Sequence, residues 1–388
     1  MGYEGGVPEA AGDGKCDSCL APVAVISTGR MSGHRIQAVT ALARRIAKLR
    51  GSAFIGNPAD APCCYAVPAD TLIGGMTAGQ LGIETEQDLF GGLVPYEVQA
   101  GKSITHGLPD PDAPGPEGWS PAFSAAVRAA VLRGFSAFDL PMARRAGTAL
   151  LEEGPVRIKA AWADGGHGQL IATDPASLDT ALKAFDAPEL PRFGLVLEQD
   201  LVDSLTYSIG RVRIGEQVLS YVGEQFTTRD NEGARAYGGS TLTVIPGELD
   251  ALRRLDLDDQ ARQAVEATIL YDHAAMRYLP GLIASRRNYD VVSGRAARGT
   301  PRIGVLEQSW RIGGASGAEI AAFEAFAADP HLAMVRASCC ERYGMPGETP
   351  LDAFVYFDGD DAEVGPLIKF ARIEARTEAQ NRNEHRAF

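Results

Sequence analysis

Four residues in the C-terminal half of the chain have side chains suited to phosphate chemistry. Glu307, Ser309 and Arg311 alternate along an apolar run, and alternate residues of a strand share one face. Asp290 lies on its own short apolar run and could occupy the neighbouring strand. The two carboxylates would then form a site for Mg²⁺, which proteins hold with one or two carboxylates plus substrate phosphates, and Arg311 would offer a positive fork for phosphate or carboxylate. The alternative is that the two acids make only surface ion pairs.

A glycine-rich loop lies upstream, between strand-like segments at 156–159 and 170–172. Glycines let backbone N–H groups close on phosphate oxygens, because no Cβ stands in the way. The loop residues that could contact a phosphate are Gly165, Gly166, His167 and Gly168. Lys159, just before the loop, would supply the ammonium that a triphosphate needs. By itself such a hairpin is more often a turn than a ligand loop, and it matches neither common phosphate-loop motif.

A third candidate element follows at 192–203. A buried-type strand there ends at Glu198, and Leu201 and Asp203 lie in the open connection beyond it. A strand that runs into an open connection presents backbone N–H and C=O groups, which an adenine edge can bind. We therefore interpret this segment as a candidate nucleotide contact.

Together these elements resemble the ATP-grasp superfamily in their order and rough spacing. The chain is also similar to a proteobacterial family of unknown function with such a core, through the segments FGGLVPYEVQAGKSITHGL, SRRNYDV, AYGGS and VLEQSWRIGGASGAE. This closer likeness spans about residues 20–370. It implies an α/β (α+β) fold, in which a small N-terminal open α/β sheet is followed by two α+β subdomains that sandwich ATP.

The resemblance also implies roles for individual residues. Those similar to the lysines and the flexible loop that hold ATP phosphates are Lys102, Lys159, Gly165, Gly166 and Gly168. Those similar to the adenine hinge are Glu198 and Leu201. Asp290 and Glu307 resemble the Mg²⁺ ligands, and Arg311 resembles the arginine near the transferred phosphoryl group. ATP and Mg²⁺ are thus the expected cofactors.

Two positions depart from the superfamily pattern. Ser309 stands where the superfamily usually has Asn; a hydroxyl can still bind Mg²⁺, though more weakly, or hold a water that does. Thr206 stands near where an acidic residue commonly binds the ribose hydroxyls, and Asp203 could substitute for it.

The resemblance implies an ATP-dependent carboxylate–amine (or carboxylate–thiol) ligase that acts through an acyl phosphate. A small-molecule carboxylate would attack the γ-phosphorus, and a second substrate, most often an amine, would displace the phosphate. Arg287, together with Arg286, could hold the acid, because a guanidinium pairs with a carboxylate bidentately; the alternative is that both are surface arginines. Other interpretations are biotin-carboxylase-like carboxylation, phosphoryl transfer to a hydroxyl, and a non-catalytic ATP-binding module, which the departures at Ser309 and Thr206 motivate.

Composition limits the class of protein. The formal net charge of −13 over 388 residues, with no basic stripe, argues against a nucleic-acid partner. There is no run of about 18 apolar residues that would predict a membrane span, and the first residues lack the apolar core of a signal peptide. We therefore expect a cytoplasmic enzyme with small-molecule partners, which could form a homodimer.

The six cysteines occur as three close pairs. Cys16 and Cys19 form a CxxC motif, which could be half of a zinc site or a redox pair. No second CxxC exists in the sequence and no thioredoxin-like pattern surrounds this one, so ordinary reduced thiols are the simpler interpretation.

The patterns along the chain divide it into four parts. These are a disordered tail at 1–20, an N-terminal α/β domain at 21–93, a linker and helical region at 94–151, and an ATP-grasp nucleotide-binding and catalytic region at 152–388. His106 lies in the linker and helical region. We expect it either to contact the residues that bind the ligand or to lie at the surface.

Overall fold

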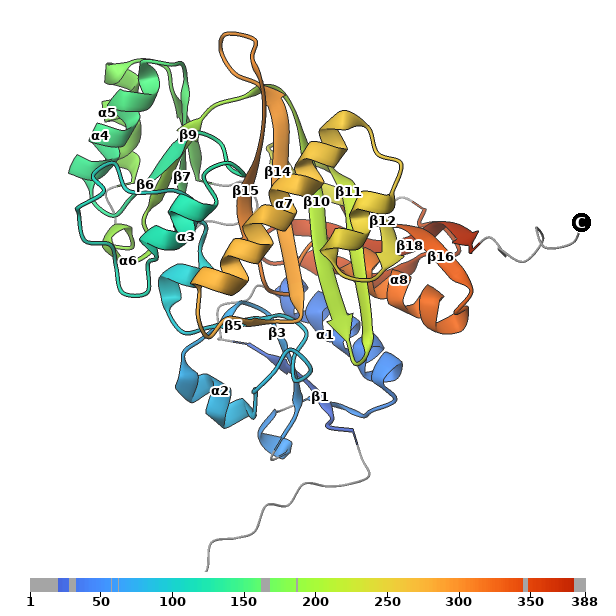
Figure 1. The fold of residues 1–388 in the computed structure, drawn as a ribbon. Coiled ribbons are helices and arrows are strands. Elements are labelled where there is room, and N and C mark those ends of the chain that lie inside the picture. The colour runs from blue at the N-terminus through green and yellow to red at the C-terminus, as the bar shows by residue number, and fades with distance from the viewer. Residues whose placement is uncertain are drawn as a thin grey trace, which may run out of the picture.

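A computed structural model describes residues 20–27, 33–56, 58–61, 63–161, 168–185, 188–344 and 348–379. These residues form four β-sheets and the helices that cover them (Figure 1). The tail expected at 1–20 lies outside the described residues except for Leu20, and so do Cys16 and Cys19. Within the described part of the chain, no helix is long and apolar enough to cross a membrane.

The N-terminal part contains a small parallel sheet, which confirms the open α/β sheet predicted there. Its strands are, in spatial order, β2 (Phe54–Ile55), β1 (Val23–Ile26) and β3 (Tyr65–Pro68). Helix α1 (Gly33–Arg50) follows β1 along the chain. Its buried residues, among them Val39, Leu42 and Ile46, recur every three or four positions, so one apolar face of the helix packs against the core.

A second small sheet ties the N-terminal part to the rest of the molecule. Its strands are, in spatial order, β13 (Ile283–Ala284), β5 (Gly92–Val94) and β4 (Leu72–Ile73). The short helices of this region are η1 (Pro58–Asp60), α2 (Gly75–Leu81), η2 (Glu97–Ala100) and η3 (Lys102–Thr105). Because β13 comes from far along the chain, the N-terminal part cannot separate from the large sheet without breaking main-chain hydrogen bonds.

A four-stranded antiparallel sheet forms a unit at one side of the molecule, green in Figure 1. Its strands are, in spatial order, β6 (Gly134–Ala137), β9 (Leu195–Gln199), β7 (Val156–Ala160) and β8 (Gln169–Ala172). Its helices are α4 (Leu140–Leu151), α5 (Pro175–Ala184) and α6 (Leu190–Phe193). Asp139 and Asp174 cap the N-termini of α4 and α5, each with a proline in the first turn. Since β6 and α4 belong to this unit, it begins before residue 152.

An eight-stranded antiparallel sheet forms the centre of the molecule. Its strands are, in spatial order, β15 (Pro301–Ser309), β14 (Arg286–Arg295), β10 (Val202–Ile214), β11 (Gln217–Arg229), β12 (Arg235–Pro246), β16 (Leu332–Tyr343), β18 (Gly365–Glu378) and β17 (Phe354–Asp361). The remaining helices are α3 (Pro121–Ala126), η4 (Leu249–Arg254), α7 (Asp259–Tyr278) and α8 (Ser316–Ala328). Helix α7 covers one face of this sheet, whereas α8 and α1 cover the other (Figure 1).

The two faces of the large sheet bury alternate residues of the same strands. On β14, Tyr289 and Val291 pack into the core beneath α7. Asn288 contacts Tyr221, whose ring lies in the core on the α8 side. Because consecutive side chains of a strand point to opposite faces, Asp290 shares the side of Asn288.

Candidate functional site

The structure brings Asp290 and Glu307 together as direct partners in the antiparallel ladder of β14 and β15. The register shifts immediately beside them, since Val291 pairs with Val305 and Leu306 is the extra residue. Such a bulge bends the strand and changes the direction of neighbouring side chains, and bulges are common next to active sites. The two strands therefore present two carboxylates at one point on the sheet.

Amide groups and one ammonium compensate this carboxylate pair. Like charges directly opposite one another destabilise a sheet. Lys102 Nζ lies 2.8 Å from Glu307 Oε2. Asp290 Oδ1 accepts hydrogen bonds from Gln225 Nε2 at 2.7 Å and from Asn288 Nδ2 at 3.1 Å. Burial and the charge of Glu307 raise the pKa of Asp290, as expected for a buried carboxyl group next to a second carboxylate.

Ser309 is directly opposite Asn288, two pairs along the same ladder. Its main-chain oxygen accepts a hydrogen bond of 3.0 Å from Arg286 Nη1, and its hydroxyl lies 3.5 Å from the same nitrogen. Four oxygen-bearing side chains thus share one face of β14 and β15, since Asn288 and Asp290, and likewise Glu307 and Ser309, are two residues apart.

Arg286 and Arg287 point to opposite faces of the sheet, because they are consecutive in β14. The Arg286 guanidinium is fully buried and bidentate to Glu319, with both N···O distances 2.8 Å. Its third nitrogen binds the carbonyl oxygens of Ser309 and Arg311. Arg286 therefore links the segment after β15 to α8 through hydrogen bonds. Because all three of its guanidinium nitrogens have protein partners, this arrangement contradicts the expectation that Arg286 holds an acid substrate.

The expectation for Arg287 needs the same correction. Its guanidinium lies on the α7 side of the sheet, 3.3 Å from Asp272 and 3.8 Å from Glu248. The structure thus separates Arg287 from the carboxylate pair on the other face. Arg311 follows β15 and is partly buried, and its Nη1 donates to the carbonyl oxygen of Ile312 at 3.2 Å.

A second group of charged residues lies in the four-stranded sheet. Lys159 on β7 forms an ion pair with Glu198 on the adjacent strand β9, and both side chains are almost fully buried. The other carboxylate oxygen of Glu198 lies 3.4 Å from His106 Nε2. Burial would raise the pKa of Glu198, but the charge of Lys159 and the contact with His106 lower it to about 2. His106 is thus a buried partner of Glu198 and not a surface residue.

The residues after Glu198 divide between the core and the surface. Leu201 is buried in a small apolar cluster with Leu132, Val292 and Ala296. Asp203 has a positive φ of 50° and is exposed, and its carboxylate lies 2.5 Å from Arg295 Nη2. Both residues lie where β9 leads into β10.

The glycine loop connects β7 to β8 in a hairpin, as the alternation predicts. Gly165, Gly166 and His167 lie outside the described residues. Gly168 has a positive φ of 65°, which favours glycine, and its carbonyl oxygen accepts from Ala160 N at 3.3 Å. The hairpin starts directly beyond the strand that carries Lys159.

One short segment connects the two charged groups. Helix η3 begins at Lys102, which reaches Glu307 on the large sheet. His106, just beyond the end of η3, reaches Glu198 on the four-stranded sheet. Gln308 on β15 also holds this segment against the large sheet, because its Nε2 donates a hydrogen bond to the carbonyl oxygen of Gly101 at 2.7 Å. The carboxylate pair and the Lys159–Glu198 pair therefore both lie against the segment where the two sheets meet.

The donor set of this site fits a hard cation. Asp290, Glu307, Asn288 and Ser309 offer only oxygen and amide groups, and Mg²⁺ prefers oxygen ligands. Among the described residues, no group of three or more His, Cys, Asp or Glu side chains is placed to hold a metal ion. A cation held by few protein ligands, with phosphates and water completing its shell, matches these residues.

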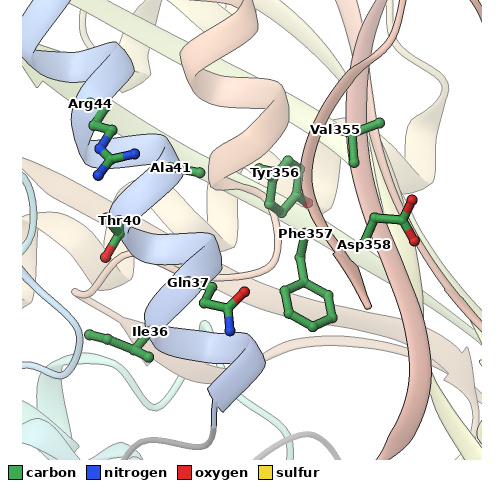
Figure 2. A pocket seen from close by; sticks show the side chains of 9 residues that line it. All are labelled: Ile36, Gln37, Thr40, Ala41, Arg44, Val355, Tyr356, Phe357 and Asp358. Atoms are coloured by element: carbon green, nitrogen blue, oxygen red, sulfur yellow. The ribbon is translucent and has the colours of Figure 1, made fainter. Parts of the chain in front are cut away.

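Figure 2 shows a surface groove beside α1. It adjoins β17, which is at the opposite edge of the large sheet from β15. It measures about 480 Å³ and runs between α1 and β17. Its lining residues are Ile36, Gln37, Thr40, Ala41, Arg44, Val355, Tyr356, Phe357 and Asp358. The groove holds neither paired carboxylates nor a lysine, so the phosphate chemistry is not assigned to it.

Three residues of the site were missed from the sequence. Asn288 could have been found, because it is two residues before Asp290 and so shares its face. Gln225 and Glu319 gave no local signal, because their contacts with Asp290 and Arg286 depend on the order of strands in the sheet and on the packing of α8.

Comparison with solved structures shows a likeness of fold over most of the chain. The biotin carboxylase domain of 2-oxoglutarate carboxylase from Hydrogenobacter thermophilus is 13% identical, with a TM-score of 0.51 over 91% of this chain and 86% of that chain. Biotin carboxylase from Campylobacter jejuni is 12% identical, with a TM-score of 0.49 over 91% and 87%. Carboxyaminoimidazole ribonucleotide synthase from Aspergillus clavatus is 14% identical, with a TM-score of 0.49 over 91% and 93%.

At such identities the likeness concerns the fold alone, and the fold is ATP-grasp-like, as the sequence predicts. A comparison with curated proteins gives no match. A family model described as "Protein of unknown function (DUF3182)" matches residues 23–371, which is most of the chain. The chain therefore belongs to the DUF3182 family.

Proposed function

We propose that this protein binds ATP with Mg²⁺ between its two antiparallel sheets and uses it to join a carboxylate to an amine. One observation carries the proposal: the segment 102–106 places an ammonium at the Asp290–Glu307 pair and adjoins the Lys159–Glu198 pair of the facing sheet. Two lysines and the Asp290–Glu307 carboxylates at one junction suit a magnesium-bound triphosphate. The ATP-grasp-like fold is consistent with this use.

The carboxylate pair would hold Mg²⁺. Asp290 and Glu307 are direct partners on neighbouring strands, and a hard cation would relieve their repulsion. The ion, when bound, would neutralise charge on the phosphates during transfer. The chain's own contribution would be to hold the two carboxylates at a fixed separation.

The phosphates and the base would bind on either side of the segment 102–106. Lys102 and Lys159 would pair with phosphate oxygens once each leaves its present carboxylate partner. The loop residues proposed to close over the phosphates are Gly165, Gly166, His167 and Gly168. The residues proposed to hold the adenine and ribose end are Glu198 at the end of β9, Leu201 in the connection beyond it, and Asp203 at the start of β10.

The chemistry would proceed in two displacements. A carboxylate oxygen of the acid substrate attacks the γ-phosphorus, the bond to the β-phosphate oxygen breaks, and ADP leaves. The amine nitrogen then attacks the acyl carbon, phosphate leaves, and the nitrogen loses a proton. Arg311 is proposed to stabilise charge on the transferred group. Arg287 has no part in this scheme, because it lies on the other face of the sheet.

An ADP-release screen tests the proposal. Pools of carboxylic acids are crossed with pools of amines in the presence of ATP and Mg²⁺, with a Glu307→Gln variant as the matched control. Release that needs both an acid and an amine, and that the variant lacks, supports ligation. Release with bicarbonate alone or with a hydroxyl acceptor alone would contradict it in favour of carboxylation or phosphoryl transfer. ATP binding without turnover across the whole set would contradict it in favour of a binding module.

A homodimer stays a prediction. The Hydrogenobacter thermophilus domain is described as a dimer. Light scattering of the full chain in solution decides the point for this protein, and a monomeric mass at micromolar concentration would contradict a stable dimer.

A further inference from the structure

The Tyr221 hydroxyl lies between two oxygens, although it has only one proton to donate. Its oxygen is 2.6 Å from Glu319 Oε1 and 2.8 Å from the side-chain oxygen of Asn288. Glu319 is bidentate to Arg286, so it can only accept. A hydrogen bond to a carboxylate is the stronger of the two. Tyr221 therefore donates to Glu319 and turns its lone pairs toward Asn288.

A lone pair on Tyr221 is better matched by the nitrogen of the Asn288 amide than by its oxygen. Half a turn of the amide exchanges these two atoms without moving the backbone. After that turn the NH₂ group faces Tyr221 and the Ser208 hydroxyl, which is 2.7 Å from the amide and can accept as well as donate. Both hydrogens of the amide nitrogen then have acceptors.

The same turn brings the amide oxygen to Asp290. It would then occupy the place of the nitrogen that is now 3.1 Å from Asp290 Oδ1. Two oxygens at this distance repel each other unless a cation binds between them. Adjacent ligands of an octahedral Mg²⁺ with bonds of about 2.0–2.1 Å lie about 3 Å apart. The separation therefore fits two ligands of one magnesium ion.

We infer that Asn288 is a metal ligand: on cation binding it turns its amide and adds a neutral oxygen to those of Asp290 and Glu307. The inference rests on the proposed function, because it takes Asp290 and Glu307 as the magnesium site. Without the ion, the NH₂ group of Asn288 compensates the charge of Asp290. With the ion, the oxygen joins the ligand set and adds no further negative charge to the pair.

This assignment changes the role expected for Ser309. Ser309 is directly opposite Asn288 in the ladder, but its main-chain oxygen and hydroxyl both face Arg286. Asn288 is buried and linked through Tyr221 and Glu319 to Arg286, so its position is well fixed. The oxygen ligand expected at Ser309 is thus supplied from the neighbouring strand.

Mn²⁺ is the probe for the test, because it replaces Mg²⁺ and is paramagnetic. The full chain is labelled with asparagine carrying ¹³C at the side-chain carbonyl and loaded with Mn²⁺ and ADP. The sequence has five asparagines. Of the two that the structure describes, Asn231 and Asn288, Asn288 is the one at the site. Electron–nuclear double resonance should show a ¹³C coupling of a directly bound carbonyl, and Asn288→Leu should remove it. Absence of this coupling with Mn²⁺ bound would overturn the inference.

Affinity gives a second, independent readout. Asn288→Leu should weaken Mn²⁺ binding in the presence of ADP about ten-fold or more, the size seen when groups around a metal are removed. Asn288→Asp retains an oxygen and should keep Mn²⁺ bound. If Asn288 served only to donate an N–H to Asp290, Asn288→Leu would leave Mn²⁺ binding no weaker than in the wild type, because only a compensating group would be lost. Asp358→Asn, in the distant groove beside α1, is the control and should change the affinity less than two-fold. Thermal unfolding confirms that each variant is folded.

The same titration separates this inference from the proposed function. If Mn²⁺ binds equally well to Glu307→Gln, the magnesium site of the proposed function is wrong. If binding depends on Glu307 but neither Asn288→Leu nor the ¹³C signal shows involvement of Asn288, only the present inference is wrong.

Discussion

Lys102 Nζ lies 2.8 Å from Glu307 Oε2, so a lysine proposed to hold phosphate is paired with a carboxylate proposed to hold Mg²⁺. The ammonium compensates a carboxylate pair that would otherwise repel. Magnesium-bound ATP offers both residues new partners at once, because Lys102 can turn to a phosphate while Glu307 binds the metal. Nucleotide and metal should therefore bind with positive coupling, each raising the affinity of the other.

Removing the Lys102 charge should have opposite effects on the two ligands. In Lys102→Met, Mn²⁺ without nucleotide should bind more tightly, by about five-fold, since a partly exposed ion pair contributes up to about 1 kcal/mol. The affinity for ATP with Mg²⁺ should fall. Electron paramagnetic resonance of free Mn²⁺ and calorimetry with a non-hydrolysable ATP analogue measure the two effects. Lys159→Met is the matched control for the first, because Lys159 pairs with Glu198 and not with the metal carboxylates.

An unchanged Mn²⁺ affinity in Lys102→Met would show that Lys102 does not oppose the cation. The same increase in Lys159→Met would show a general effect of net charge instead of the specific pair.

Lys159→Ala should weaken ATP binding and also destabilise the fold. Loss of a phosphate-pairing ammonium costs about 1.5–3 kcal/mol, or roughly ten- to a hundred-fold in affinity. The change also leaves Glu198 as an uncompensated buried charge. The double variant Lys159→Ala/Glu198→Gln should therefore regain thermal stability without regaining ATP affinity. Calorimetry on the double variant is the cleaner test, and full ATP affinity there would remove Lys159 from the nucleotide site.

The Lys159–Glu198 pair should make stability depend on acid pH. The pKa of Glu198 is lowered from 4.5 to about 2 in the folded protein. Its stabilising contribution is thus complete above about pH 4.5 and is lost as the pH falls toward 2. Urea unfolding of the wild type and of Glu198→Gln at pH 6 and pH 3 checks this. The difference in free energy of unfolding between the two should be smaller at pH 3; an equal difference at both values would contradict the lowered pKa.

The Arg286–Glu319 pair should matter for stability far more than an exposed pair. Both side chains are fully buried, so Arg286→Met leaves Glu319 without its partner and should cost about 3–5 kcal/mol of unfolding free energy. Arg295→Met breaks the exposed pair with Asp203 and should cost less than about 1 kcal/mol. Chemical denaturation measures both. Similar small losses in the two variants would show that Arg286 does not fasten the segment after β15.

The sequence predicts the placement of the carboxylate pair because strand periodicity is local. Glu307 and Ser309 share a face as predicted, and Asp290 is the direct partner of Glu307. The same periodicity could have excluded Arg287, which is an odd number of residues from Asp290 and so faces the other side. Arg287 is close to Asp290 in the sequence, which suggested that it holds the acid substrate. The alternation of side chains along the strand instead places it on the face away from Asp290.

Other parts of the site could not be predicted, because they depend on contacts between distant segments. The sequence does not show that Glu319 on α8 neutralises Arg286, nor that His106 and Lys159 share Glu198. These contacts arise from the packing of α8 on the large sheet and of the segment 102–106 against the four-stranded sheet. A buried charge must be paired within the protein, so the packing of these segments determines which arginines and lysines already have a carboxylate partner and which can bind a ligand.

Calorimetry of a non-hydrolysable ATP analogue, with and without Mg²⁺, tests most directly whether this protein binds magnesium nucleotide at the Asp290–Glu307 pair. We expect binding to the wild type to be strongly enhanced by Mg²⁺, and Glu307→Gln to lose that enhancement while remaining folded. Asp358→Asn, in the distant groove beside α1, should behave like the wild type. The same Mg²⁺ enhancement in Glu307→Gln as in the wild type, or no binding of the analogue to the wild type at all, would contradict the proposed site.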